Sequence, residues 1–321
     1  MAMKLHQLRA FETVARIGNF TRAAEELFVT QPSLSRQIST LEADLGNELF
    51  RRAPTGITLT DAGEILLPIA RRMLGDAELA RRQLDEISGL RRGHVRLGAP
   101  PTLCVSMVAD VLATFRSAHP GIDLHVTESG SRLLVDALEE SKLDLALVVT
   151  REEELPATTI ELIPLLSEEL VVISAAEVLG LDTGSVPGEL TLAELAEIPQ
   201  AAFNRGYDLR IATDAAFAAQ RLTPTIAVEG AEMDAVLRFV ERGLGVAVVP
   251  AMVVLDRPML RSARLVDPPL TRTVNLARRS DVRLSAAASE MQRIVFDTVT
   301  RLTEPGTELA QLVTAAQAQN P

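Results

Sequence analysis

Apolar residues recur at helical spacing through three short stretches at the start of the chain. The first stretch predicts a helix over residues 4–18, which Gly18 ends. The second predicts a helix from Thr21, as its N-cap, to about Phe28, and the third begins at Pro32, which suits a first helical turn. The side chains expected to face a shared core are Leu5, Leu8, Phe11, Val14, Ala15, Ala24, Leu27, Phe28, Leu34, Ile38, Leu41 and Leu45. Three such helices around a tight polar break predict a helix-turn-helix.

The outward side of the third helix has small or hydrogen-bonding side chains, and no acidic residue occurs in it before Glu42. These outward residues are Pro32, Ser33, Ser35, Arg36, Ser39 and Thr40. Such a face can enter the major groove of DNA, approach phosphates closely and read base edges. A plain helical hairpin packed inside a larger core is the alternative interpretation. We favour DNA reading because Gly46 stops the helix and Arg51 and Arg52 follow soon after.

Two short strands are predicted after this helix, over residues 49–52 and 56–60, with a turn at residues 53–55. Together they form a wing beside the helix-turn-helix. Arg51 and Arg52 are placed to meet the phosphate backbone of DNA. Adjacent strand residues point to opposite faces, so a purely structural role for Arg51 stays open.

A heptad pattern covers residues 61–91. Its seam has the 4-3-4-3-4-3 spacing of a coiled coil and consists of Leu66, Ala70, Met73, Ala77, Ala80, Leu84 and Ile87. Asp61 is expected to cap the helix, and Pro68 to bend it or disturb its first two turns. The thin, alanine-rich seam favours a dimerising linker helix over one packed on its own domain, which needs a wider apolar stripe. The residues that would widen the stripe are Ile65, Ile69 and Leu74.

From His94 onward, short β-branched runs alternate with helical stretches. The strand-like runs cover residues 95–98, 124–126, 145–149, 170–173, 246–249 and 274–277, and the helical stretches cover 105–118, 132–141, 207–221 and 231–242. This alternation predicts an α/β fold with parallel sheets covered by helices. Ligands of such sheets meet the carboxyl ends of strands and the amino ends of the next helices. Pro101, Thr102 and Ser131 occupy such positions and suit an anion, most simply a carboxylate.

Further candidates for this pocket are Thr150, Phe203 and Asn204, with Tyr207 as a more remote one. Hydroxyl groups at helix starts are often only structural caps, so their joint placement, rather than any single residue, predicts the pocket. Cys104 lies beside it, where both redox sensing and plain apolar packing remain open. An internal disulfide is excluded because the chain has one cysteine.

Composition and charge indicate that different parts of the chain have different roles. A chain of 321 residues with 47% hydrophobic content can hold two or three domains. The net charge of -11 argues against a general nucleic-acid-binding protein, yet residues 1–60 carry seven basic and six acidic side chains. A small DNA-reading head on an acidic body fits both observations. Since the chain shows no signal sequence and no apolar run long enough for a membrane, we expect a cytoplasmic protein without a membrane partner.

Catalytic and cofactor chemistry are not indicated. The four histidines lack metal-ligand spacing, and no Ser-His-acid order or phosphate-binding glycine loop stands out. We expect no catalytic residue, no metal and no cofactor. The competing hypothesis is a small-molecule-binding or enzymatic α/β domain whose helical hairpin does not bind DNA.

Residues 23–52 read A-A-E-E-L-x-x-T-Q-P-S-L-S-R-Q-I-x-x-L-E-x-x-L-G-x-x-L-F-x-R, and residues 59–63 read L-T-x-A-G. The chain resembles the LysR-type transcriptional regulators, densely over about ninety residues and more loosely nearly to the end. The resemblance implies a two-subdomain regulatory domain of periplasmic-binding-protein-like fold. The implied divisions are a winged helix-turn-helix domain (1–60), a linker or dimerisation helix (61–91), a regulatory domain (94–303, with subdomain I at 94–165 and 271–303 and subdomain II at 166–270) and a tail (304–321) that matches no family pattern.

The resemblance also implies site residues and partners. The expected DNA contacts are Thr21, Gln31, Pro32, Ser33, Ser35, Arg36 and Arg52. The expected effector contacts are Pro101, Thr102, Ser131, Thr150, Phe203 and Asn204. The partners would be double-stranded DNA with an inverted-repeat operator, a small anionic effector in the cleft, and further copies of the chain in a dimer or tetramer. RNA polymerase is a further candidate partner.

Overall fold

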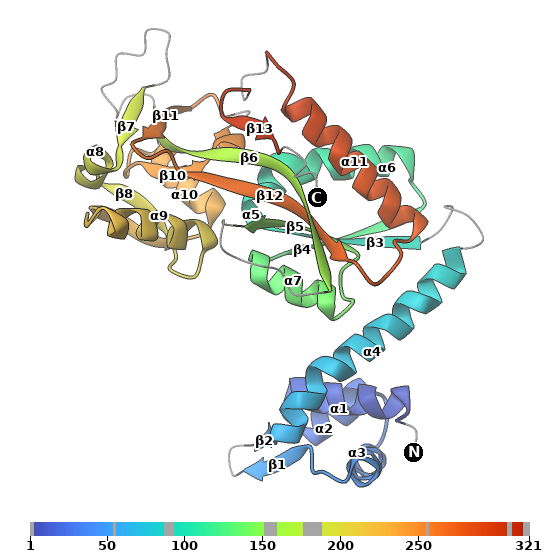
Figure 1. The fold of residues 1–321 in the computed structure, drawn as a ribbon. Coiled ribbons are helices and arrows are strands. Elements are labelled where there is room, and N and C mark those ends of the chain that lie inside the picture. The colour runs from blue at the N-terminus through green and yellow to red at the C-terminus, as the bar shows by residue number, and fades with distance from the viewer. Residues whose placement is uncertain are drawn as a thin grey trace. The chain divides into compact units, whose positions relative to one another are not determined.

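The computed structural model describes residues 3–53, 56–86, 93–150, 159–175, 188–254, 257–306 and 310–316. The chain divides into two compact units, one formed by residues 1–89 with 139–142 and the other by residues 90–138 with 143–321. Figure 1 shows the first unit as helices with one small hairpin, and the second as a long sheet flanked by helices.

The first unit is a winged helix-turn-helix, as predicted (Figure 1). Its elements are α1 (Leu5–Ile17), α2 (Phe20–Glu26), α3 (Gln31–Leu45), β1 (Phe50–Ala53), β2 (Gly56–Leu59) and α4 (Asp61–Glu86). Strands β1 and β2 are antiparallel, with Phe50 opposite Leu59. The ring centroids of Phe50 and Phe11 are 5.3 Å apart, so the hairpin is anchored on the helical core.

Two details of α2 differ from the prediction. Asn19, not Thr21, caps this helix, because the helix begins at Phe20 and the Asn19 Oδ1 accepts the N–H of Arg22 at 3.1 Å. Phe28 was expected to face inward, but its side chain is 96% exposed. The helix has already ended at this point, and Phe28 adopts a left-handed backbone conformation with φ 54° that turns its ring away from the core.

Helix α4 starts with a different cap from the one predicted. The Thr60 Oγ1 accepts the N–H of Gly63 at 3.1 Å, so Thr60 takes the role expected of Asp61. Gly63 is required here because a Cβ would lie 2.2 Å from the backbone oxygen of Leu49. The helix continues through Pro68 without a break in its assignment.

The predicted apolar seam of α4 is corrected at its first two positions. Leu66 and Ala70 are 8% and 0% exposed and belong to the core that α4 shares with α1 and α3, which Leu74 also contacts. Ile65 and Ile69, expected to widen the inward stripe, are instead 68% and 49% exposed. In the first turns of this helix the inward and outward positions are therefore interchanged relative to the prediction, while Met73 and Leu84 of the predicted seam remain exposed.

A mixed nine-stranded sheet forms the second unit among the described residues. Its strands are β3 (Gly93–Ala99), β4 (Ile122–Glu128), β5 (Leu145–Thr150), β6 (Ile160–Ala175), β7 (Glu189–Thr191), β10 (Ala247–Pro250), β11 (Leu260–Val266), β12 (Thr271–Arg279) and β13 (Val313–Ala315). The order is β4-β3-β5-β12-β6-β11-β7, and β10 and β13 also pair with β6. The prediction of parallel sheets is right for β3, β4 and β5. It is wrong for β12, which is antiparallel to both of its neighbours, and for β10, which is antiparallel to β6.

Strand β6 carries the chain from one half of this unit to the other. Its first part, up to Glu169, pairs with β12 and β13, and its second part, from Leu170, pairs with β10 and β11. A small parallel pair, β8 (Gln200–Phe203) with β9 (Ile226–Ala231), belongs to the second half. The helical elements are α5 (Pro101–Leu103), the π-helical turn η1 (Cys104–Val108), α6 (Ala109–Ala118), α7 (Ser131–Glu139), α8 (Leu192–Glu197), α9 (Asp208–Ala219), α10 (Met233–Glu241), the 3-10 turn η2 (Ala251–Val254) and α11 (Ala286–Leu302).

Helices α6 and α11 lie side by side in the first half (Figure 1). Phe115 of α6 and Met291 of α11 are fully buried with Val95 and Leu97 of β3 in one core. In the second half, α10 passes into β10 through Gly245, whose φ is 147° and whose Cβ would lie 2.6 Å from the Pro199 oxygen. Only glycine fits this approach, as the sequence predicts.

The carboxyl-terminal tail is more ordered than expected. Residues 313–315 form β13, which pairs antiparallel with residues 166–168 of β6. Backbone bonds extend the pairing, since Glu169 N–H donates to the Leu312 oxygen at 2.8 Å. Val313 is 1% exposed. This part of the tail therefore belongs to the sheet and not to a frayed end.

Candidate functional site

The polar side of α3 is turned outward by three buried positions. Leu34, Ile38 and Leu41 are at most 2% exposed in the core of the first unit. Gln31, Pro32 and Arg36 are exposed, and Ser33 and Ser35 are partly exposed. A helix that buries one apolar stripe and presents short polar groups opposite it has the shape and chemistry of a groove-reading helix.

Arg36 is the exposed cation of this face. Its Nε donates to the Pro32 oxygen at 3.4 Å, a long bond within the same helix, and no carboxylate among the described residues pairs with it. Thr21 is exposed in the first turn of α2, and Arg51 is exposed on β1. The side chain of Arg52 and the whole of Ile87 lie outside the described part of the chain.

A cavity of about 650 Å³ lies in the second unit and is lined by both of its halves. Pro101, Thr102, Ser131 and Asn204 line it, so four of the six predicted effector contacts come together. Thr150 and Phe203 are not among its lining residues. The Thr150 Oγ1 accepts a hydrogen bond from the Asn275 amide at 2.8 Å. The Phe203 ring is buried and stacks on Tyr207, with centroids 5.0 Å apart.

Thr102 is linked by the buried Arg272 to β6, the strand that passes from one half of the unit to the other. The Arg272 Nη1 donates to the Thr102 Oγ1 at 2.8 Å, and its Nε donates to the Glu168 Oε2 at 2.8 Å. The other oxygen of Glu168 accepts the backbone N–H of Met252 at 2.6 Å. A fully buried carboxylate thus links the cavity lining with η2 in the opposite half. Sequence reasoning missed Arg272 and Glu168, because their chemistry depends on a pairing 104 residues apart in the chain.

Ser131 joins the two halves by another route. Its hydroxyl oxygen accepts the N–H of Val149 at 3.0 Å, which fixes the start of α7 against β5. Its own backbone N–H donates to the Asp208 carboxylate at 3.2 Å. Asp208 opens α9 in the second half, so an acidic group of the chain itself faces the first turn of α7.

Three carboxylates line the cavity, which the sequence reasoning did not anticipate. They belong to Glu128, Asp208 and Glu232. The sequence carries a signal for them, because Glu128 ends β4 and Glu232 immediately precedes α10, and strand ends and helix starts are also where the pocket hydroxyls are predicted. Burial raises the pKa of the neighbouring Tyr207 hydroxyl above its usual value, and the charge of Glu232 raises it further.

Cys104 begins η1 and is partly buried. Burial, followed by the charge and hydrogen bonding of Glu128, raises the pKa of its thiol to about 11. The thiolate that a helix start would favour is therefore disfavoured here. This geometry supports the packing interpretation of Cys104.

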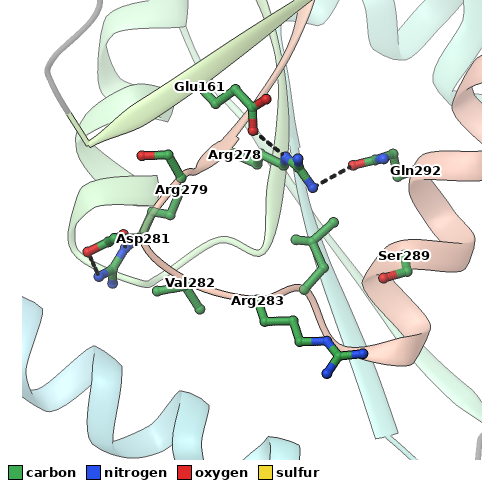
Figure 2. A pocket seen from close by; sticks show the side chains of 10 residues that line it. Glu161, Arg278, Arg279, Asp281, Val282, Arg283, Ser289 and Gln292 are labelled. Atoms are coloured by element: carbon green, nitrogen blue, oxygen red, sulfur yellow. Dashed lines mark hydrogen bonds and ion pairs between the residues drawn. The ribbon is translucent and has the colours of Figure 1, made fainter.

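A second hollow of about 440 Å³ lies where β12 leads into α11. Figure 2 shows Arg278 held between Glu161 and Gln292, with Arg279 on Asp281. Arg278 and Arg279 both donate hydrogen bonds to acidic side chains of the chain itself. This hollow therefore has fewer N–H donors for an anion than its number of arginines suggests.

Within the described ranges, no group of three or more potential metal-binding side chains occurs. Within the same ranges, no helix has the length and apolar character needed to cross a membrane.

Comparison with known proteins covers both units. Residues 5–64 match the family described as bacterial regulatory helix-turn-helix protein, lysR family, and residues 88–299 match the LysR substrate binding domain. The HTH-type transcriptional regulator YybE of Bacillus subtilis (strain 168) is 31% identical over 294 residues, covering 92% of this chain and 98% of that protein. The nitrogen assimilation regulatory protein nac of Klebsiella aerogenes is 30% identical over 317 residues, covering 97% and 100%.

Among solved structures, full-length CbnR in complex with its target DNA has a similar fold, with a TM-score of 0.64 at 24% identity over 93% of this chain and 99% of CbnR. The match to the helix-turn-helix family, the match to the substrate binding domain and the full-length relatives all indicate the same family. The chain belongs to the LysR family of bacterial transcriptional regulators, with a DNA-binding domain at its amino end and an effector-binding domain after it.

Proposed function

We propose that this regulator reads an inverted-repeat operator with one α3 from each protomer of a dimer. The observation that carries the proposal is the outer face of α3, where Gln31, Pro32, Ser33, Ser35 and Arg36 stand opposite the buried leucine and isoleucine stripe. Thr21 and Arg52 would hold the phosphate backbone, which positions the helix without reading bases. The structure of CbnR with its target DNA supports the proposal by analogy.

The dimer contact is proposed on α4. Its exposed apolar side chains, Ile65, Ile69, Met73 and Leu84, follow one another at near-helical spacing. Ala77 and Ala80 of the predicted seam lie on the same helix and leave room for close approach. We further propose that the larger units pair to form a tetramer and that the protein contacts RNA polymerase at the promoter. These two proposals rest on the family resemblance alone.

The cavity near Thr102 is proposed as the effector site. An acidic group of the effector would meet the Thr102 hydroxyl and the buried Arg272, which already lie 2.8 Å apart. Binding there would affect β6 where it passes between the two halves, because Arg272 is hydrogen-bonded to Glu168 of that strand. This linkage supports an effector that changes DNA binding or promoter activation by shifting the halves of one domain.

A gel-shift assay tests whether the protein binds DNA sequence-specifically. DNA from around the protein's own coding region is titrated with the full chain, against specific and scrambled competitors. We expect a shifted band that specific competitor removes and scrambled competitor leaves. Equal competition by both DNAs across the region would contradict sequence-specific reading and favour the alternative of a binding domain without DNA specificity.

A further inference from the structure

The effector cavity is lined by more negative than positive side chains. Its charged lining consists of Glu128, Arg132, Asp208, Glu232 and Arg272, which carry three negative and two positive charges. A lining with this balance of charge favours cations over anions. The charge of the lining therefore differs from what a simple carboxylate ligand needs.

One of the two positive charges is already neutralised. The Arg272 side chain is 8% exposed, and its Nε and Nη2 both lie 2.8 Å from the Glu168 Oε2. Glu168 is fully buried behind it and does not line the cavity. Arg272 therefore offers an incoming acid directional N–H donors more than net charge. Its Nη2 is buried against Glu168, and its Nη1 donates to the Thr102 Oγ1 in the cavity lining.

The three carboxylates act on the Tyr207 hydroxyl, on which the opposite charge of Arg272 also acts. The charges of Glu232, Glu128 and Asp208 all raise the pKa of the Tyr207 hydroxyl, after the larger effect of burial. The buried Tyr207 oxygen has no hydrogen-bond partner within the described ranges. A hydroxyl oxygen left without a donor costs free energy that a ligand N–H can recover. The Tyr207 ring also gives an aromatic surface beside these carboxylates, which suits a cation.

We infer that the effector is a zwitterion of amino-acid type, with an ammonium or guanidinium group at Glu232, Glu128 and Asp208 and an acidic group at Thr102 and Arg272. Leu170, Leu209 and Ile211 line the rest of the cavity and accept the carbon chain between the two groups. The volume of about 650 Å³ falls in the ordinary range for small-molecule sites. The inference rests on the proposed role of this cavity as the effector site.

Isothermal titration of the full-length protein tests the charge requirement with four probes of similar length. L-Ornithine and L-glutamate carry both groups, putrescine has only amines, and succinate has only acids. We expect L-ornithine to bind at least about tenfold more tightly than succinate and putrescine, because each of these lacks one of the two partners. Tightest binding by succinate, or no binding by either amino acid, would overturn the inference.

Variants locate the binding. Glu232→Gln should weaken L-ornithine about tenfold and leave succinate unchanged or tighter, because it removes a negative charge without changing the side-chain shape. Glu128→Gln gives a second test if the first variant folds poorly, and Glu197→Gln, at an exposed position of α8 outside the cavity, is the matched control. An unchanged affinity for L-ornithine in both folded cavity variants would contradict the assignment.

Thr102→Val separates this inference from the proposed function. If succinate binds and Thr102→Val abolishes its binding, the cavity is the effector site and only the amine requirement is wrong. If no probe's binding responds to Thr102→Val, Glu232→Gln or Glu128→Gln, the effector site itself lies elsewhere. If ornithine binding depends on both Thr102 and Glu232, both proposals stand.

Discussion

Within the part of the chain that the structure describes, the Arg36 side chain pairs with no carboxylate and makes one long hydrogen bond, to the Pro32 oxygen. Replacing it by alanine removes a group that is available to DNA and leaves the core of α3 intact. If Arg36 reads a guanine, Arg36→Ala should cost about 1–3 kcal/mol and relax preference at one base. If it holds a phosphate, affinity should fall about equally on all sequences and the salt slope should shrink by about one.

Fluorescence anisotropy with operator and mutant operators at several salt concentrations distinguishes these two outcomes. The double variant Arg36→Ala, Ser35→Ala is the stricter test. If it stays folded and binds the operator as tightly as the parent, α3 is not the reading helix.

Cys104 should behave as a protected thiol. Its pKa of about 11, against an ordinary value of 9.0, should slow alkylation by iodoacetamide at pH 8 about a hundredfold relative to urea-unfolded protein. Because the unfolded thiol ionises first, its contribution to stability is present below pH 9 and is lost as the pH rises towards 11. Mass spectrometry of timed samples measures the rate. Alkylation as fast as in urea would show that the thiol is neither buried nor shifted.

Glu168 offers the clearest stability prediction, because its carboxylate is buried and satisfied by Arg272 and the N–H of Met252. Glu168→Ala leaves a buried guanidinium without its partner and should destabilise the second unit by about 3–5 kcal/mol. Glu161→Ala breaks the more exposed pair with Arg278 and should cost no more than about 1 kcal/mol. Urea unfolding compares the two variants. Equal losses would mean that burial does not decide the strength of these pairs.

At the scale of elements, α4 has one apolar stripe in the core of the first unit and one exposed stripe, which we propose as the dimer contact. Ile69→Glu places a charge on the exposed stripe and should weaken dimers at least about tenfold without unfolding the first unit. Ala70→Glu, one residue away, places the charge in the core of that unit and should unfold it. Analytical ultracentrifugation and circular dichroism separate the two effects. A fully dimeric Ile69→Glu protein would remove this stripe from the interface.

The sequence pattern could not decide which stripe of α4 is which. Leu66 and Ala70 fit a coiled-coil seam as well as Ile65 and Ile69 fit a core, since both stripes recur every three or four residues. The choice depends on how α1 packs, and one chain's periodicity does not contain that information. By contrast, Leu34, Ile38 and Leu41 form a single stripe on α3, and their burial was predicted correctly.

In the second unit, local sequence signals place some of the pocket residues, and tertiary packing decides the others. Thr102 and Ser131 were found because local signals, a strand end followed by a helix start, place them. Phe203 and Thr150 satisfy the same local rule, yet side-chain packing turns them away from the cavity. The partners of Arg272 come from distant segments, so only the folded chain could identify them.

At the scale of the whole molecule, reading heads on a two-fold dimer predict a symmetric operator. Hydroxyl-radical footprinting should show two protected half-sites whose centres lie about one helical turn, or a multiple of it, apart. The acidic composition, with a net charge of -11, should keep binding to unrelated DNA weak. A single protected half-site, unchanged at protein concentrations where the dimer forms, would contradict two-headed reading.

The pairing of β13 with β6 has a consequence in genetic terms. The segment that follows α11 is easily taken for expendable. Residues 313–315 of it nevertheless pair with 166–168, and Glu168 among these supports the lining of the cavity. A nonsense allele in this stretch would leave the DNA-binding domain encoded in full and would remove β13, which pairs with β6. Its phenotype should be a regulator that still occupies its operator but misreads its signal. Stop codons between α11 and β13 should therefore be scored as regulatory alleles and not as silent ones.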